Sequence, residues 1–203
     1  GFAAREDTGS FWSTDMNAAQ PRPTPEIRER MVHVVQGEYA VVSEPGIVLS
    51  TILGSCVATC LWDPVAAVGG MNHFLLPGDE SSGSDSMKYG VNAMELLVNG
   101  LLQRGALRSR IQGKLFGGAH VIRNFSDIGA KNVEFALKFL QMEGIPCVGQ
   151  SMGGPQARRI RFWPLTGRAG QMLLDPSNAE VISAERARPA PAPASAAGSV
   201  ELF

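Results

Sequence analysis

The sequence predicts a single domain of the α+β class. Short segments rich in β-branched residues come in hairpin-like groups and do not alternate regularly with helices. Two longer segments carry apolar residues at helical spacing. The chain has 203 residues, of which 44% are hydrophobic and 18% charged, so it is large and apolar enough to bury one core.

The predicted domain spans residues 28–176 and lies between two ends of different composition. Residues 1–27 are rich in Ala, Gly, Ser, Thr, Asn and Pro and show no sustained period, so we expect a flexible N-terminal arm. Residues 177–203 contain the Pro/Ala tract ARPAPAPASAAGS, which favours extended and solvated backbone. We therefore expect a C-terminal tail outside the core.

The first part of the domain is predicted to form strands. MVHVVQGEYAVVS is typical of two short strands broken at Gly37, and GIVLSTIL predicts a third. VGGMNHFLL predicts a return strand. Between these, CVATCLW fits either a short helix or a buried strand, and Asp63-Pro64 ends it in both cases. The expected strands are 31–35, 38–43, 46–53 and 68–76.

The second part of the domain is predicted to contain both helices. Apolar residues recur on one face of 86–105 and of 127–144, and Gly105 and Gly144 suit their C-terminal caps. The remaining expected strands are 113–122, 145–151 and the two arms of a hairpin over 158–174 that turns at Pro-Leu-Thr-Gly.

Composition argues against several classes of function. Eighteen basic and nineteen acidic residues give a formal charge of -1, which leaves little positive charge to bind phosphates, so nucleic acid is not an expected partner. No apolar run reaches the roughly 20 residues that cross a bilayer, and the N-terminus lacks a secretory signal pattern. We expect a cytoplasmic protein without membrane insertion.

A Gly-Ser-Cys turn is the first candidate for chemistry. The turn Gly54–Cys56 follows a predicted strand, and backbone N–H groups there, near Ser55 and Cys56, can favour a thiolate and bind an oxyanion. This arrangement favours Cys56 as a nucleophile. The alternative is a packing role, because free cysteine is among the most buried residue types.

His73 is the best candidate for a base acting on Cys56. Two antiparallel strands joined through the Asp63-Pro64 turn would bring His73 across from the cysteine. Either Ser50 or Thr51 could then hydrogen-bond the imidazole and set its tautomer. A Cys-His pair with a hydroxyl group suits acyl transfer at an amide or ester. His120 is the reserve candidate for the base.

The other cysteines are assigned to packing, and no metal or cofactor is predicted. The chain has three cysteines, an odd number that argues against a disulfide framework, and we expect Cys60 and Cys147 in the core. Cys56, Cys60 and His73 are too few ligands for a structural zinc site. No glycine pair continues into a phosphate-binding loop, so nucleotide binding is not expected.

Five segments together resemble the CheD family, the bacterial chemoreceptor glutamine deamidases. They are LGSCVATCLWDP, VGGMNHFLLPG, KLFGGAHVI, IGAKNVEFALKFLQMEGIP and GQSMGGPQARRIRFWPLTG, in that order along the chain. The resemblance as a whole runs over about residues 31–175. The resemblance implies hydrolysis of glutamine side chains to glutamate on the cytoplasmic domains of methyl-accepting chemotaxis receptors. It also implies two packed mixed or antiparallel β-sheets with flanking helices, similar to a deamidase toxin domain.

The resemblance also implies roles for particular residues. The family's nucleophile falls on Cys56 and its histidine on His73. Its third residue, usually threonine, falls on Ser50, which Thr51 follows; serine keeps the hydroxyl group but lacks the methyl group that restrains the rotamer. Met152 stands where the family commonly has an acidic residue.

Other functions stay open on the sequence. The family includes members that pair with CheC-type phosphatases, so a non-catalytic module that regulates such a phosphatase or a receptor is the alternative. A cysteine protease or a transglutaminase would use the same Cys-His chemistry.

Overall fold

The computed structural model describes residues 28–76, 83–120 and 126–175, so the predicted arm (1–27) and tail (177–203) lie outside it. The strands described are β1 (Arg30–His33), β2 (Tyr39–Val42), β3 (Ile47–Leu53), β4 (Val57–Asp63), β5 (Val68–Phe74), β6 (Gln112–Gly117), β7 (Cys147–Met152), β8 (Arg158–Trp163) and β9 (Arg168–Leu173). The helices described are α1 (Gly83–Gln103), α2 (Ser126–Met142) and the short 3-10 helix η2 (Arg108–Arg110).

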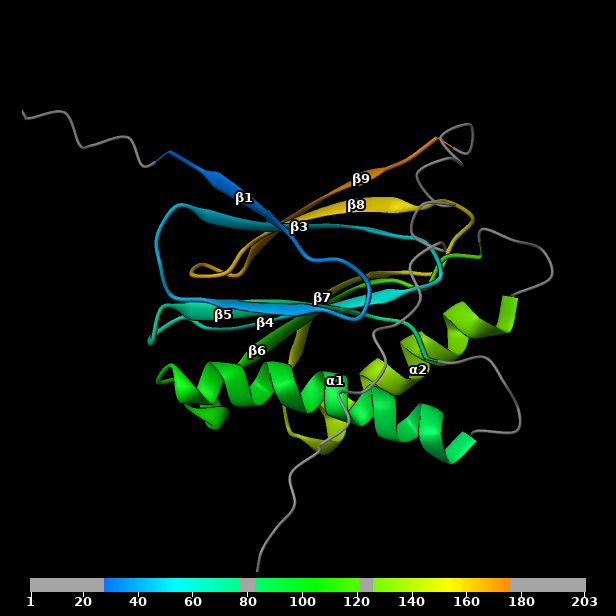
Figure 1. The fold of residues 1–203 in the computed structure, drawn as a ribbon, viewed down its shortest axis with the longest axis horizontal. Coiled ribbons are helices and arrows are strands. Elements are labelled where there is room, and N and C mark those ends of the chain that lie inside the picture. The colour runs from blue at the N-terminus through cyan, green and yellow to red at the C-terminus, as the bar shows by residue number, and fades with distance from the viewer. Residues whose placement is uncertain (1–27, 77–82, 121–125, 176–203) are drawn as a thin grey trace, which may run out of the picture.

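The strands form two mixed sheets that pack face to face (Figure 1). Sheet A has the order β1-β3-β8-β9, and sheet B has the order β2-β5-β4-β6-β7. Each sheet contains one parallel pair, β1 with β3 and β6 with β7, and its other pairs are antiparallel. The helices α1 and α2 lie on the face of sheet B that points away from sheet A (Figure 1). The predicted α+β fold is confirmed.

Two apolar clusters hold these layers together. The helix-side cluster lies between sheet B and the helices, and the inter-sheet cluster lies between the sheets. Successive side chains of β4 point to opposite faces, so Val57 and Leu61 join the helix-side cluster while Ala58 and Cys60 join the inter-sheet cluster. Large buried members of the inter-sheet cluster are Leu49, Leu53, Met71, Ile160 and Phe162.

Two predicted segments are refined by the structure. CVATCLW, which fitted a helix or a strand, forms the central strand β4, and every residue of β4 is buried because both faces of sheet B are covered. The strand expected over 113–122 ends at Gly117, because Gly117 and Gly118 have positive φ angles of 114° and 65° that turn the chain.

The helices end where the sequence predicts. Gly105 and Gly144 follow α1 and α2 in the left-handed conformation, with φ angles of 93° and 65°. In the part of the chain that the structure describes, no helix combines the length and the apolar character that crossing a membrane requires.

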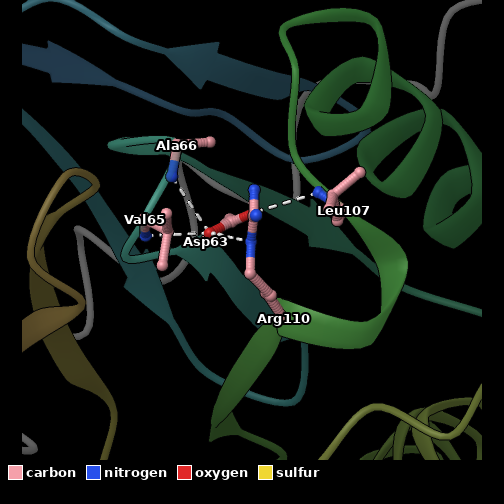
Figure 2. A network of polar contacts seen from close by, with 5 residues as sticks. All are labelled: Asp63, Val65, Ala66, Leu107 and Arg110. Carbon is pink, nitrogen blue, oxygen red and sulfur yellow. Dashed lines mark hydrogen bonds and ion pairs between the residues drawn. The ribbon is translucent and has the colours of Figure 1, made fainter.

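A buried aspartate organises the β4–β5 turn (Figure 2). Asp63 Oδ1 accepts hydrogen bonds from the backbone N–H groups of Val65 at 2.9 Å and Ala66 at 3.1 Å. Its Oδ2 accepts one from Leu107 N–H at 2.9 Å, and Arg110 Nη2 lies 2.8 Å from the same oxygen. The carboxylate therefore ties the turn to the segment between α1 and β6.

The same contacts keep the Asp63 carboxyl ionised. Burial by itself would raise the pKa of Asp63. The hydrogen bonds from Arg110 and from the backbone N–H groups of Leu107, Ala66 and Val65 outweigh burial and hold this pKa below its usual range.

Candidate active site

The Gly54–Cys56 turn, which joins β3 to β4, is held from outside by hydrogen bonds to its backbone. The carbonyl oxygen of Gly54 accepts a hydrogen bond from Ala119 N–H at 2.8 Å, and that of Cys56 accepts one from Gly118 N–H at 2.8 Å. The carbonyl oxygen of Ser55 accepts one from Asn132 Nδ2 at 3.0 Å. All three donors lie in or near β6 and α2. The position of the predicted nucleophile therefore depends on segments far along the chain.

Two residues behind the turn were missed by sequence reasoning. Gly117 must be glycine, because a Cβ atom there would lie 2.1 Å from the carbonyl oxygen of Cys56. Asn132 is completely buried on α2, and while its Nδ2 donates to Ser55, its Oδ1 accepts from Leu76 N–H at 2.8 Å. The Gly-Gly pair was visible in the sequence only as a break in a strand, and Asn132 gave no signal.

Cys56 belongs to the inter-sheet cluster and is 5% exposed. Its thiol donates a hydrogen bond to Gln36 Oε1 over 3.5 Å. Gln36 belongs to the turn between β1 and β2, which sequence reasoning did not connect with the cysteine.

His73 lies on β5 beside the start of β4. The antiparallel register places Phe74 opposite Val57 and His73 opposite Ala58, so the strand pairing expected from the Asp63-Pro64 turn is confirmed. The imidazole is 1% exposed, and its Nδ1 lies 2.8 Å from Thr51 Oγ1 on β3 of sheet A. His73 and Thr51 thus join the two sheets.

The contacts of Nδ1 indicate the tautomer of His73. Nδ1 also lies 3.4 Å from the carbonyl oxygen of Val34, and a carbonyl oxygen can only accept a hydrogen bond. This contact favours the tautomer with the proton on Nδ1, which leaves the Nε2 lone pair to accept a proton.

Burial keeps the His73 imidazole uncharged. It lowers the pKa of His73 to about 4, and the hydrogen bond to the Val34 carbonyl opposes this shift only in part. At neutral pH the ring is therefore a neutral base that can take a proton when a thiol reacts.

This depressed pKa predicts how stability responds to pH. Between pH 6.5 and about 4, an unfolded chain binds a proton at this histidine and the folded chain does not, so the free energy of unfolding falls over this range. We expect His73→Gln to remove this part of the decrease when urea unfolding is followed at pH 7 and pH 5. An NMR titration placing the midpoint of His73 at about 6.5 would contradict the prediction.

The two candidate hydroxyl groups lie on opposite faces of β3. Thr51 faces His73, whereas Ser50 Oγ donates to the carbonyl oxygen of Ile160 on β8 at 2.9 Å. Because successive side chains of a strand alternate between faces, both residues cannot reach the imidazole in this register. Of the two residues that the sequence offered, the structure brings Thr51 to the histidine.

The other cysteines and the reserve histidine lie in different surroundings. Cys60 is buried in β4, and burial raises the pKa of its thiol above the usual range, although the charge of Lys114 opposes this slightly. Cys147 is exposed, so the prediction of a core position was wrong; it begins β7, an edge strand of sheet B. His120 is exposed, and its backbone N–H donates to Gly154. Within the three described ranges, no three His, Cys, Asp or Glu side chains form a group that could hold a metal ion.

The sequence of this chain is similar to those of a known protein family. A family model described as CheD chemotactic sensory transduction matches residues 75–171. The chain is 52% identical over 179 residues to the probable chemoreceptor glutamine deamidase CheD of Agrobacterium fabrum, with coverage of 88% of this chain and 99% of that protein. The protein of the same name from Rhizobium leguminosarum bv. trifolii is 54% identical over 177 residues, with coverage of 86% and 96%. The chain belongs to the CheD family.

Two solved structures are more distant from this CheD family member. Bacillus licheniformis hypothetical protein YfiH aligns with a TM-score of 0.39 and 15% identity, covering 62% of this chain and 60% of that one. A Neisseria meningitidis protein of the DUF152 family aligns with a TM-score of 0.42 and 10% identity, covering 71% and 74%. The CheD family model begins after Cys56 and His73, so the case for these two residues depends on the geometry around them.

Proposed function

We propose that this CheD family protein is a hydrolase that converts specific glutamine side chains of methyl-accepting chemotaxis receptors to glutamate. The observation that carries the proposal is a buried, neutral His73 that contacts Thr51 and lies on β5, the strand paired with β4, which begins directly after Cys56. Support comes also from relatives named probable chemoreceptor glutamine deamidase that match more than four fifths of the chain. Its substrates are the cytoplasmic domains of receptors, so the proposed location is the cytoplasm.

The first half of the proposed reaction forms a thioester. His73 Nε2 takes the proton from Cys56, and the sulfur attacks the carboxamide carbon of the receptor glutamine. Backbone N–H groups of the Gly54–Cys56 turn stabilise the negative oxygen of the tetrahedral intermediate. The C–N bond then breaks, and the imidazolium of His73 returns its proton to the leaving nitrogen, which departs as ammonia.

The second half consumes water. The neutral imidazole takes a proton from a water molecule, whose oxygen attacks the thioester carbon. The C–S bond breaks, the sulfur of Cys56 recovers a proton from the imidazolium of His73, and glutamate is released. Thr51 holds the ring with its proton on Nδ1 throughout, so that Nε2 is the nitrogen that takes and returns protons in each step.

The proposed product differs from the substrate by one negative charge. A neutral amide on a receptor helix becomes a carboxylate, which changes interactions with charged neighbours along that helix. The new carboxylate can also be methyl-esterified, which the amide cannot.

Mass spectrometry of receptor cytoplasmic fragments tests the proposal directly. Each converted glutamine is expected to raise the fragment mass by about 1 Da and to release one molecule of ammonia, with Cys56→Ala as the blank reaction. Cleaved fragments would indicate a protease, and incorporation of an added amine would indicate a transglutaminase. A stable complex with a receptor fragment or with a CheC-type phosphatase, without any change in receptor mass, would favour the regulatory module and overturn the proposal.

Removing the Thr51 hydroxyl group is expected to slow deamidation. Thr51→Val keeps the shape of the side chain but not the hydrogen bond to His73 Nδ1, so we expect kcat to fall by about 10-fold or more, a share of the roughly 10²–10⁴-fold that a positioned general base contributes. The measurement is ammonia release at saturating receptor fragment.

Ser50→Ala is the matched control for this variant. It removes a buried hydroxyl group that bonds the Ile160 carbonyl, so we expect a loss of about 1 kcal/mol in stability and little change in kcat. A larger loss of kcat in Ser50→Ala than in Thr51→Val would assign the third role to Ser50, as the family resemblance implies.

A further inference from the structure

A side chain outside the predicted site contacts the sulfur that reacts in the proposed function. Cys56 Sγ donates to Gln36 Oε1 over 3.5 Å, a distance within the usual reach of a sulfur hydrogen bond. Gln36 is half-buried, and it comes from neither of the strands β4 and β5 that bring the cysteine and the histidine together.

The turn that carries Gln36 is built onto the backbone of His73. Glu38 N–H donates to the carbonyl oxygen of Val35 at 3.0 Å, and Gly37 has the positive φ of 86° that suits the third position of a tight turn. Gly37 N–H donates to His73 O at 2.7 Å, and His73 N–H donates to Glu38 O at 3.0 Å. The backbone that positions the base therefore also positions Gln36.

A carboxamide is suited to a sulfur atom that changes its charge. The thiol is a donor, whereas the thiolate formed when His73 takes the proton can only accept hydrogen bonds. A glutamine side chain offers a carbonyl oxygen to the first state and an NH₂ group to the second, and a half-turn about its last side-chain bond exchanges them. A carboxylate at the same place could serve the thiol only.

We propose that Gln36 is a further catalytic residue of the deamidation reaction, which accepts a hydrogen bond from the Cys56 thiol at rest and donates one to the thiolate during attack. This inference rests on the proposed function, because it takes Cys56 as the nucleophile. In this step the S–H bond of Cys56 breaks and an N–H bond forms at His73 Nε2. The carboxamide of Gln36 changes only the atom that it presents to the sulfur.

Gln36 carries the same functional group as the proposed substrate, but the contact differs from the one that attack requires. The sulfur meets the amide oxygen of Gln36, whereas attack requires the sulfur to approach the amide carbon. We therefore expect residue 36 to remain glutamine in the purified active protein. A mass increase of about 1 Da assigned to residue 36 would make Gln36 a self-substrate and overturn its role as a partner of the thiolate.

Alkylation of Cys56 by iodoacetamide tests the inference without any receptor. The full chain is used with Cys147→Ala, which removes an exposed competing thiol, and the modified cysteine is assigned by mass spectrometry. In Gln36→Glu the added negative charge opposes thiolate formation. We therefore expect the alkylation rate at pH 7 to fall by about 10-fold or more and the midpoint of the rate against pH to move to higher pH. Gln36→Met, which neither donates nor repels, is expected to give an intermediate rate.

Gln141 provides the matched control, because it is an exposed glutamine near the end of α2. Gln141→Glu and Gln141→Met are expected to leave the alkylation rate within about 2-fold of the parent, since an exposed charge is well screened. If Gln36→Glu reacts as fast as the parent while its thermal unfolding is unchanged, the inference is wrong.

The same variants separate the inference from the function on which it rests. In receptor assays we expect Gln36→Met to lower kcat with little change in KM, because the lost contact acts on the reacting sulfur. If the parent protein fails to deamidate any receptor but the alkylation rates keep the expected order, the proposed function fails and the coupling of Gln36 to Cys56 stands. If deamidation occurs and the order is absent, only the inference about Gln36 fails.

Discussion

Replacing Cys56 with alanine is expected to lower the rate of receptor glutamine deamidation by about 10⁴-fold or more, because no thioester can form. The Cys56→Ser variant is expected to be nearly as inactive as Cys56→Ala. Burial lowers the pKa of His73 to about 4, so its imidazole is a weak base and removes the proton of a hydroxyl group much less readily than that of a thiol. Rates of ammonia release and of the 1 Da mass increase in receptor fragments measure both effects.

Cys147 supplies the control for this experiment. It is an exposed cysteine on the edge strand β7, so Cys147→Ala removes a thiol without disturbing the inter-sheet cluster. We expect its deamidation rate to stay within about 2-fold of the wild type, as for most surface substitutions. A Cys56→Ala protein that folds and still deamidates at a tenth of the wild-type rate would rule out the Cys56 thiol as nucleophile.

Asp63→Asn is expected to lower the free energy of unfolding by about 3 kcal/mol, because the fully buried carboxylate accepts hydrogen bonds from backbone N–H groups and pairs with Arg110, whose side chain is 32% exposed. The substitution replaces one carboxylate oxygen with an NH₂ group and leaves the Arg110 charge without its partner. Both oxygens of Asp63 accept hydrogen bonds from N–H groups in the folded chain. In either orientation the NH₂ group of an asparagine would therefore face another N–H donor. Urea unfolding at pH 7 measures the difference.

The Asp63 effect should also depend on pH. The pKa of this carboxyl is held below its usual range, so its contribution is complete above the unfolded value of about 3.9 and is lost as the pH falls toward the folded value. The gap between wild type and Asp63→Asn is therefore expected to narrow below about pH 4. A gap that stays constant would show that shape, and not charge, accounts for the loss.

Glu143→Gln is the comparison for this stability measurement. Glu143 also pairs with an arginine, Arg108, but the side chains are 32% and 49% exposed. Solvent screens such a pair, and we expect a loss of less than about 1 kcal/mol. Equal losses in the two variants would contradict the view that burial gives the Asp63 pair its importance.

Local sequence patterns predict most of the strands and helices, but they do not predict which strand belongs to which sheet. Gly37 marked the break between the first two strands, yet two short strands around a tight turn are equally typical of a hairpin. In the structure β1 pairs with β3 in sheet A and β2 pairs with β5 in sheet B, and the turn between them hydrogen-bonds to the backbone of His73. The central strand β4 was ambiguous because burial on both faces removes the alternation that identifies a strand.

The sequence predicts those parts of the candidate site that depend on neighbouring segments of the chain. The Asp63-Pro64 turn was enough to pair the strands near Cys56 and His73. The choice between Ser50 and Thr51 requires knowing which face of β3 meets the other sheet, and no local pattern reports this. Gln36 comes from another part of the chain, and polar residues in turns are too common to attract notice.

The hydrogen bond between Thr51 and His73 crosses from one sheet to the other, so the proposed active site exists only while the two sheets keep their relative position. An expanded state could keep all its strands and helices and still separate the hydroxyl group from the imidazole. Loss of activity on heating should therefore precede loss of secondary structure whenever the sheets can slip first. Enzymatic rate would then measure the alignment of the two sheets, which circular dichroism of the backbone does not detect.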